Sequence, residues 1–432
     1  MTTRTSTKSA ETDPSSSGVA HQLADVVAAT YGALPVRIRA WDGSETTVPA
    51  DAPVVIVRSP DALRRLLFHP GELGLAQAYV AGELDVDGDL LDGFRRVWQT
   101  VRCGHVAKRP SLSALATATR TALRLGAVGV PPPPPDSQAR MRGRLNSALR
   151  DRAAISHHYD LSNAFYELIL DPHMAYSCGY WTSDDPAYTG TDAQRDKLGL
   201  VCAKLGLSSG MRMLDVGCGW GSLSLYAAET FDIAVTSVTL SREQRDFVQA
   251  RVDARGLTNV DVRHQDFRDV IDEPFDAIGS IEMGEHVGRA NYPAFAASIR
   301  SLLRPQGRVL IQQMSRRTHR GGGPFIEAFI APDMDIRPVG ETVEMIEAAG
   351  LEVRDVHALR EHYVRTIQAW YDTFESHWDD AVALVGEEVA RVWRLYMVGA
   401  ALSFEEGRMG VDQILAVRPE VGRAGLPPVR DW

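Results

Sequence analysis

The second half of the chain alternates between short apolar runs and amphipathic helical stretches, and this alternation limits the fold more than any other feature. From residue 190 onward, the strand-like runs are MRMLDVG, AVTSVTL, VDVRHQD, FDAIGSIEM and RVLIQQM. The helical stretches between them are SLSLYAAETF, SREQRDFVQARVDARG and YPAFAASIRSLLRPQG, with Gly256 and Gly307 as expected helix exits. Strands that alternate with helices predict an α/β fold, a parallel sheet with helices on both faces.

A glycine-rich turn, LDVGCGWGS at 214–222, follows the first strand and opens a helix. Gly217, Gly219 and Gly221 allow a tight turn and a close approach of a ligand to the backbone. The spacing GxGxG is shorter than the dinucleotide fingerprint and lacks the Lys-Ser/Thr pair of a phosphate-binding loop. Asp215 at the strand end is placed to accept the ammonium of an amino-acid-like ligand. The turn therefore favours S-adenosylmethionine over a dinucleotide.

Polar residues also follow the next two strands. Thr239, Ser241 and Gln244 in VTLSREQ offer neutral hydrogen bonds where a dinucleotide site usually has an acidic residue. After the third strand, Asp266 is placed to accept from an adenine amino group, with Phe267 beside the ring. The alternative for Asp266 is a simple loop cap. Open α/β sheets bind ligands at the carboxyl ends of their strands, so the three ends together favour a cofactor site.

Residues 19–128 are expected to form a small α+β domain after a disordered tail at 1–18. PVRIRAWDG and VPADAPVVIVRSP predict strands, and SPDALRRLLFHP predicts a helix with Ser59 as N-cap and Pro60 at its first position. In LAQAYVAGELDVDGDL, the segment AYVAGELD predicts a helix end and a turn.

A basic stretch separates the two halves. Residues 101–155 hold ten Lys and Arg against two acidic residues, and 129–150 are expected to be a Pro-rich basic linker with a stiff spacer of prolines at 131–135. One interpretation is a solvated linker helix. The other is a surface for an anionic partner such as lipid headgroups.

Composition excludes several classes of protein. The net charge of −10 argues against nucleic-acid binding. The four cysteines form no CxxC pair and no zinc spacing, so we expect no metal site and a reduced, intracellular protein. The N-terminus lacks the apolar core of a signal peptide. No apolar run approaches the ~20 residues of a membrane span, so any membrane contact is expected to be peripheral.

Two further stretches are rich in aromatic residues. HHYDLSNAFYELILDPHMAYSCGYW at 157–181 crowds polar and aromatic groups upstream of the glycine turn. TIQAWYDTFESHW predicts a helix with one apolar face, for which core packing is the default and a wall for an apolar substrate the alternative. The residues on that face are Ile367, Trp370, Tyr371, Phe374 and Trp378.

With these stretches, the chain resembles the cyclopropane fatty-acyl-phospholipid synthase family, which is related to the mycolic acid methyltransferases. The resemblance runs from about His157 to the C-terminus and, more weakly, through AYVAGELD. It also rests on EHVG at 285–288 and HYVRTIQAWYDTF at 362–374. It implies a Rossmann-like class I S-adenosylmethionine-dependent methyltransferase domain at 151–432, with a mostly parallel seven-stranded sheet. It also implies that the domain at 19–128 engages lipid.

The resemblance implies a site as well. The upstream stretch would cover the cofactor and line an acyl pocket, with Cys178 beside the reacting carbons. The residues expected to bind S-adenosylmethionine are Tyr176, Ser177, Asp215, Gly217, Gly219, Gly221, Thr239, Leu240, Ser241, Gln244, Asp266 and Phe267. In the family a bicarbonate ion is the base, and its ligands carry over to Cys178, Glu285, Gln312, Met314 and Tyr363.

Two of these five positions depart from the family pattern. Gln312 replaces His and Met314 replaces Ile, and an amide neither titrates nor carries positive charge, so it holds an anion less well. Whether bicarbonate binds stays open. Taken alone, Cys178 also fits a small buried hydrophobe and Tyr363 a core phenol with a partnered hydroxyl.

The implied reaction is methyl transfer to the cis double bond of an acyl chain in a membrane phospholipid. It passes through a carbocation that aromatic faces stabilise and a base deprotonates. Direct proton loss closes a cyclopropane. A hydride shift before proton loss leaves a 10-methylene type branch, which a partner reductase completes. The altered base pocket favours the methylene product. The resemblance also implies a cytoplasmic protein peripherally associated with the inner face of the membrane, and leaves a homodimer open.

There are three alternative functions. One keeps the cofactor but methylates a small-molecule acceptor. Another is a non-catalytic lipid-binding partner subunit with a decayed site, which Gln312 alone favours. A nicotinamide oxidoreductase lacks both the GxGxxG fingerprint and the ribose carboxylate.

Overall fold

The computed structural model describes residues 18–32, 35–47, 52–103, 111–139, 162–317, 321–430 and 432. The chain divides into two compact units, Met1–Asp136 and Ser137–Trp432. The expected tail up to residue 17 lies outside the described residues. So do residues 140–161, which include the second half of the expected linker and the beginning of the crowded stretch.

The first unit contains a three-stranded sheet in the order β1-β2-β3, in which β2 runs parallel to β1 and antiparallel to β3. Helix α2 begins as predicted, because the Ser59 hydroxyl accepts a hydrogen bond of 3.0 Å from the Asp61 backbone N–H and Pro60 follows the cap. The elements are α1 (Val19–Tyr31), β1 (Arg37–Ala40), β2 (Val54–Val57), α2 (Pro60–Phe68), α3 (Glu72–Val80), β3 (Leu84–Asp87), α4 (Leu90–Arg102) and α5 (Leu112–Arg124).

Strand β3 was not predicted, since the sequence analysis ended this segment in a turn. Its sequence LDVD carries two aspartates, a residue type depleted in strands, and its pairing with β2 overrides that preference. The proline run also belongs to the first unit. Arg65 forms a bidentate pair with Glu83 and donates a hydrogen bond of 2.8 Å to the carbonyl of Pro133.

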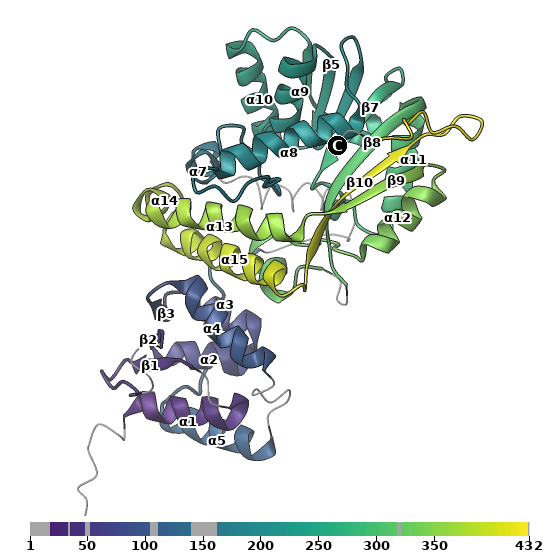
Figure 1. Ribbon diagram of the computed structural model, residues 1–432. Coiled ribbons are helices and arrows are strands. Elements are labelled where there is room, and N and C mark those ends of the chain that lie inside the picture. Colours follow the sequence, from purple (N-terminus) through teal and green to yellow (C-terminus); the bar gives the residue numbers. More distant parts are fainter. Residues whose placement is uncertain are drawn as a thin grey trace, which may run out of the picture. The chain divides into compact units, whose positions relative to one another are not determined.

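The second unit is built on a seven-stranded sheet in the order β6-β5-β4-β7-β8-β10-β9. All strand pairs are parallel except those of β10, which runs antiparallel to β8 and β9 (Figure 1). The predicted fold class is therefore confirmed. The strands are β4 (Arg212–Val216), β5 (Ala234–Thr239), β6 (Val260–His264), β7 (Phe275–Ile281), β8 (Leu303–Ser315), β9 (Glu352–Ala358) and β10 (Gly410–Val417).

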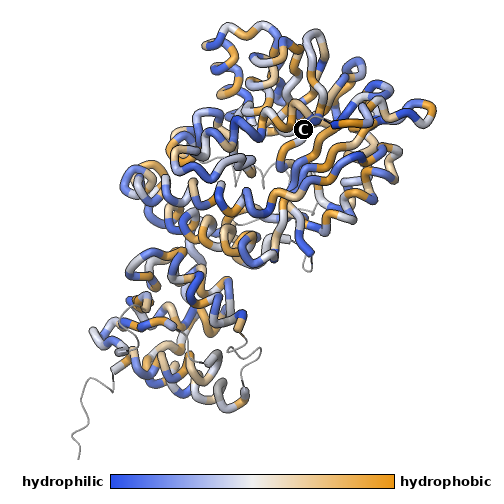
Figure 2. The backbone as a smooth tube through the Cα atoms, in the orientation of Figure 1, coloured by the Kyte–Doolittle hydropathy of each residue, from blue (hydrophilic) through white to orange (hydrophobic). Residues whose placement is uncertain are grey.

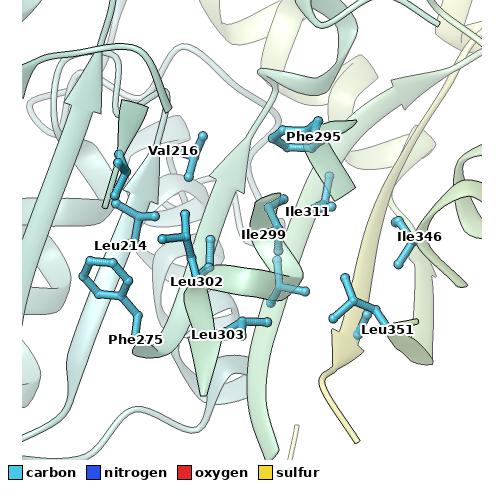
Figure 3. Close-up of a cluster of buried hydrophobic side chains, with 14 of the residues drawn as sticks. Leu214, Val216, Phe275, Phe295, Ile299, Leu302, Leu303, Ile311, Ile346 and Leu351 are labelled. Carbon is cyan, nitrogen blue, oxygen red and sulfur yellow. The ribbon is translucent and has the colours of Figure 1, made fainter. Parts of the chain in front are cut away.

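Helices cover both faces of this sheet because its central strands are apolar on both sides. Leu214 belongs to a buried cluster that includes Phe295 of α11 and Ile346 of α12 (Figure 3), whereas the adjacent Met213 belongs to a second cluster that includes Leu198 of α8. Figure 2 shows the same concentration of apolar residues along the strands. The helices are α7 (Asn163–Ile169), α8 (Gly190–Leu205), α9 (Ser222–Phe231), α10 (Arg242–Ala254), α11 (Tyr292–Leu302), α12 (Val339–Ala348), α13 (Arg360–Ser376), α14 (Trp378–Val385) and α15 (Glu387–Glu405).

Short helical turns complete the unit: η2 (Phe267–Asp269), η3 (Gly284–His286) and the π-helical η4 (Ile326–Ile330). Helices α13 and α15 lie side by side (Figure 1). Within the described part of the chain, no helix has both the length and the apolar composition needed to cross a membrane.

Two predicted helix ends need correction. Gly256 does follow α10 with φ 65°, but Gly307 lies inside β8, because α11 already ends at Leu302. Pro305 explains the early end, since a proline disfavours helical backbone at the residue before it. The aromatic helix predicted to reach Trp378 ends at Ser376, and Trp378 begins α14 after His377 leaves helical geometry at φ −119°, ψ 29°.

Candidate active site

A cavity of about 190 Å³ lies at the carboxyl ends of β4, β5 and β7. The order of the strands reverses between β4 and β7, which is where open α/β sheets bind their ligands. The predicted cofactor residues that line it are Tyr176, Ser177, Asp215, Gly217, Gly219, Thr239, Leu240, Gln244 and Phe267. Gly221, Ser241 and Asp266 are not among the lining residues.

The glycine turn is shaped by left-handed backbone and close contacts. Gly217, Gly219 and Gly221 have φ of 78°, 53° and 82°. A Cβ on Gly217 would lie 2.5 Å from Met283 Cγ, and one on Gly221 would lie 2.8 Å from Val248 Cγ1. A Cβ on Gly219 would meet no protein atom within 4 Å. Gly219 therefore leaves room for a ligand, whereas Gly221 lets α9 pack on α10.

Gly217→Ala is expected to weaken binding of S-adenosylmethionine, because the new methyl group would push Met283, a lining residue, into the cavity. We expect about a tenfold loss of affinity in calorimetry, equivalent to about 1.4 kcal/mol. Gly210→Ala is the matched control, since Gly210 has φ 83° and open space around its Cβ position. Equal affinities of the two variants would contradict this account.

Asp215, at the end of β4, is held by the Ser224 hydroxyl, which in turn accepts from Ser237. Ser224 donates a hydrogen bond of 2.6 Å to Oδ2, and Ser237 donates one of 2.7 Å to Ser224. Burial raises the pKa of Asp215 to about 6, although Ser224 and Lys197 oppose the shift. The group stays ionised at neutral pH and faces the cavity, as a partner for an ammonium group requires.

The other two strand ends differ from each other. At β5, the Thr239 hydroxyl donates to Gln244 Oε1 at 2.8 Å, and Ser241 caps α10 by accepting from the Gln244 N–H. At β6, both carboxylate oxygens of Asp266 bind the Arg268 guanidinium, at 2.9 and 2.6 Å. Asp266 also caps η2, which is the loop-cap alternative, and Arg268 lines the cavity instead.

A second group of polar side chains converges on Glu282, a residue to which the sequence analysis assigned no role. Its Oε1 accepts from the Cys178 backbone N–H at 2.8 Å and from Gln312 Nε2 at 2.9 Å. Its Oε2 accepts from the Tyr363 hydroxyl at 2.6 Å. Glu282 also lines the cavity. Three of the five predicted catalytic positions are thus brought together, around a carboxylate that directly follows β7.

Glu285 and Met314, the other two positions, form a separate contact. The Met314 backbone N–H donates to Glu285 Oε1 at 2.6 Å, while Oε2 has no hydrogen-bond partner among the described residues. Burial, reinforced by the charge of Glu282, raises the pKa of Glu285 to about 8. Glu285 is therefore mainly protonated at neutral pH.

The Cys178 thiol points away from Glu282 towards backbone carbonyls. Sγ lies 3.3 Å from the Gly179 oxygen and 3.6 Å from the Leu359 oxygen. Burial raises the pKa of this thiol well above its ordinary value, so it is not a nucleophile at neutral pH. Only the backbone of Cys178 takes part in the polar cluster.

Two helices hold residues 162–181, the described part of the aromatic stretch, over the cavity. From α8, Gln194 Nε2 donates to the Ser177 carbonyl at 2.8 Å and Lys197 Nζ donates to the Ser177 hydroxyl at 2.8 Å. From α13, Thr366 Oγ1 accepts from the Gly179 N–H at 3.1 Å. Lys197 is fully buried, and it was not predicted as a site residue. The one signal in the sequence was a lysine within the apolar face of a helix.

Aromatic rings surround Tyr176, beside the polar cluster. Its ring centroid lies 5.3 Å from that of Trp370, 5.9 Å from Trp393, 5.7 Å from Tyr166 and 6.4 Å from Trp220. Trp370 belongs to the predicted apolar face of α13. Since Tyr176 and Trp220 also line the cavity, its wall combines aromatic rings with the carboxylate of Glu282.

The sheet with a single antiparallel strand, the glycine turn and the acidic residue at the end of β4 together define a class I S-adenosylmethionine-dependent methyltransferase. A family model described as mycolic acid cyclopropane synthetase matches residues 146–414, more than half of the chain. The chain belongs to this family, which confirms the resemblance seen in the sequence.

Relatives of this chain carry names of the same kind. A probable fatty acid methyltransferase, Rv3720 of Mycobacterium tuberculosis, is 36% identical over 95% of this chain and 97% of its own length. The cyclopropane-fatty-acyl-phospholipid synthase of Escherichia coli K12 is 32% identical over 86% and 89%. The crystal structure of mycolic acid cyclopropane synthase CmaA1 with SAH and CTAB covers 62% of this chain and 98% of its own, with 33% identity and a TM-score of 0.58. The protein is an enzyme of this class, and S-adenosylmethionine is its cofactor.

Proposed function

We propose that the enzyme transfers a methyl group to the cis double bond of an unsaturated acyl chain in a phospholipid and releases a methylene-branched chain. The observation that carries the proposal is the carboxylate of Glu282, held at the cofactor cavity beside an aromatic wall. The names of the relatives point to the same substrate class, since they are fatty acid methyltransferases and cyclopropane synthases.

The residues supply what this chemistry needs. S-adenosylmethionine, when bound, supplies an electrophilic methyl group, and Asp215 and the glycine turn hold and orient it. An isolated alkene is a poor nucleophile, so it must be fixed in line with the methyl group in a dry pocket. The rings of Tyr176 and Trp220 line the cavity and offer faces that stabilise a carbocation without reacting with it.

Proton loss decides the product. If the added methyl group loses a proton at once, a cyclopropane closes. If a hydride moves first to the cationic carbon, the charge shifts to the methyl-bearing carbon and proton loss leaves an exocyclic methylene. Gln312 supports the second course, because it replaces an imidazole with a neutral amide next to the deprotonation step. A methylene product then calls for a separate reductase to saturate it.

We also propose peripheral contact of the first unit with the inner face of the cytoplasmic membrane, where the lipid lies. Leu67, Phe68 and Leu75 support this contact, since their side chains are 44%, 47% and 47% exposed. Large apolar groups at a surface are typical of interaction sites. Self-association through the same unit stays a prediction, to be checked by light scattering.

The test is expression in a bacterium with known cis-unsaturated lipids and methyl-labelled methionine, followed by gas chromatography and mass spectrometry of fatty-acid methyl esters. We expect a labelled acyl chain heavier by one CH₂, whose branch is reduced by hydrogenation under conditions that spare a cyclopropane. A labelled cyclopropane would retain the substrate and correct the product. Methyl transfer to a water-soluble acceptor, with no labelled acyl chain, would contradict the proposal.

A further inference from the structure

Glu282 occupies an unusual backbone position. It follows the last residue of β7 with φ 51°, in the left-handed region that side-chain-bearing residues rarely adopt. Such strain persists where the surrounding structure holds it in place and is typical of functional sites. Here the strained backbone turns the carboxylate into the cluster formed by Cys178, Gln312 and Tyr363.

The hydrogen bonds leave one position on this carboxylate open. A carboxylate oxygen has two lone pairs. Oε1 already accepts from the Cys178 N–H and the Gln312 amide, so both of its lone pairs are used. Oε2 accepts from the Tyr363 hydroxyl, which leaves its second lone pair free to take a proton.

The charges separate the roles of the two neighbouring carboxyls. Burial raises the pKa of Glu282, while Tyr363, the Cys178 N–H, Gln312 and Lys197 oppose that shift. Burial and the charge of Glu282 raise the pKa of Glu285 to about 8. Glu282 is the member that faces the cavity, and its three hydrogen-bond donors favour the charged form of its carboxylate.

We propose that Oε2 of Glu282 is the proton acceptor of the reaction, a base built into the chain in the place where the family resemblance implies a bicarbonate ion. This inference rests on the proposed function. The alkene π pair forms the new bond to the methyl carbon, and the S–CH₃ bond breaks with its electron pair left on sulfur. A hydride moves from the methyl-bearing carbon to the cationic carbon, which leaves the positive charge on the methyl-bearing carbon. A C–H bond of the added methyl group then breaks. Its proton goes to Oε2 and its electron pair forms the new C=C bond.

This assignment also accounts for Gln312. Its Nε2 donates to Glu282, while its Oε1 accepts from Gln413 Nε2 at 3.0 Å, so the amide is fixed in one orientation. A cationic imidazole in its place would stabilise the carboxylate and lower its basicity. A neutral amide donates a hydrogen bond to the side-chain carboxylate without lowering its basicity in this way. The sequence departure at Gln312 and the carboxylate at Glu282 thus belong together.

The first experiment measures labelled acyl product from vesicles of a dioleoyl phospholipid and methyl-labelled S-adenosylmethionine, in buffer freed of carbon dioxide. We expect the wild type to keep its full rate, with no more than about twofold stimulation by added bicarbonate. Glu282→Gln should bind S-adenosylhomocysteine in calorimetry as the wild type does and lose about 10²–10⁴-fold in rate, the usual contribution of a general base. Asp412→Asn, which also neutralises a buried carboxylate of this sheet, is the matched control and should stay within about threefold of wild type.

The second experiment uses Glu282→Gly, because glycine adopts φ 51° without strain and opens room at the cluster. Added formate or bicarbonate should raise the rate of this variant at least about tenfold. A merely structural role for Glu282 would give no such rescue. An inactive wild type overturns the proposed function and the base assignment with it. An active wild type that requires bicarbonate overturns the base assignment alone. So does a Glu282→Gln variant that keeps more than a third of the rate, or a product that also gains a hydroxyl.

Discussion

Asp215→Asn is expected to weaken binding of S-adenosylmethionine by about 30- to 100-fold, the largest loss of affinity that a single isosteric change should cause here. The carboxylate lines the cavity and is fixed by Ser224 at 2.6 Å, so it receives the ligand ammonium without reorganisation. An amide keeps the shape and removes the charge. Isothermal calorimetry with S-adenosylmethionine measures the loss directly.

The same residue gives the binding a pH dependence. Since burial raises the pKa of Asp215 to about 6, its charge is complete well above pH 6 and is lost as the pH falls through that value. Wild-type affinity should therefore decline below pH 6 by up to about tenfold per pH unit, whereas the Asn variant should show no such decline. Parallel pH profiles for the two proteins would exclude Asp215 as the ammonium partner.

Lys197→Met is expected to cause the largest loss of stability, about 3 kcal/mol in the free energy of unfolding at pH 8. Lys197 is fully buried on α8, donates to Ser177 at 2.8 Å, and its charge opposes the raised pKa values of Asp215 and Glu282. Methionine fills the space but leaves two buried carboxylates uncompensated. Urea unfolding followed by circular dichroism measures the change.

Lys204→Met is the matched control on the same helix. Lys204 is also buried and lies 2.8 Å from Asp355, but that carboxylate is 26% exposed and water can solvate it once the lysine is gone. We expect a smaller loss, about 1 kcal/mol, and unchanged cofactor affinity.

The two lysine variants should also differ in how their stability depends on pH. A raised carboxyl pKa destabilises the folded state only where the group is ionised, so the deficit of Lys197→Met should be full at pH 8 and shrink as the pH falls through about 6. A deficit that is the same at pH 5 and pH 8 would contradict the electrostatic explanation.

Several parts of the fold were predictable because local signals agreed with tertiary packing. The run Met213–Val216, apolar except for Asp215, with glycines directly after it, predicted a buried strand and a ligand turn, and both were found. Where local signals were weak or ambiguous, prediction failed. Strand β3 was missed because its sequence contains two aspartates. A helix end was predicted at Gly307, but this residue lies inside β8, because Pro305 ends the helix earlier.

The residues of the candidate site also fall into a predictable group and an unpredictable one. Residues that belong to one strand–turn–helix unit, such as Asp215 and Gly217, were predicted from their spacing to lie together, and both line the cavity. The contact of Asp266 with adenine stays a prediction, because spacing does not decide where a side chain points. In this structure the carboxylate binds Arg268. Cys178 was predicted to hold an anion, and in this structure its backbone N–H donates to the Glu282 carboxylate.

The sequence by itself determined the fold class, the cofactor and the family, because these depend on periodicity and on short motifs whose residues are close together in the chain. The tertiary structure alone decided which carboxylate stands at the centre of the site. Glu282 gains that position from donors at Cys178, Gln312 and Tyr363, and its charge is supported by Lys197 on another helix. These groups are far apart in the chain. Only the folding of α8, β7, β8 and α13 around one cavity brings them within hydrogen-bonding and electrostatic reach of a single side chain.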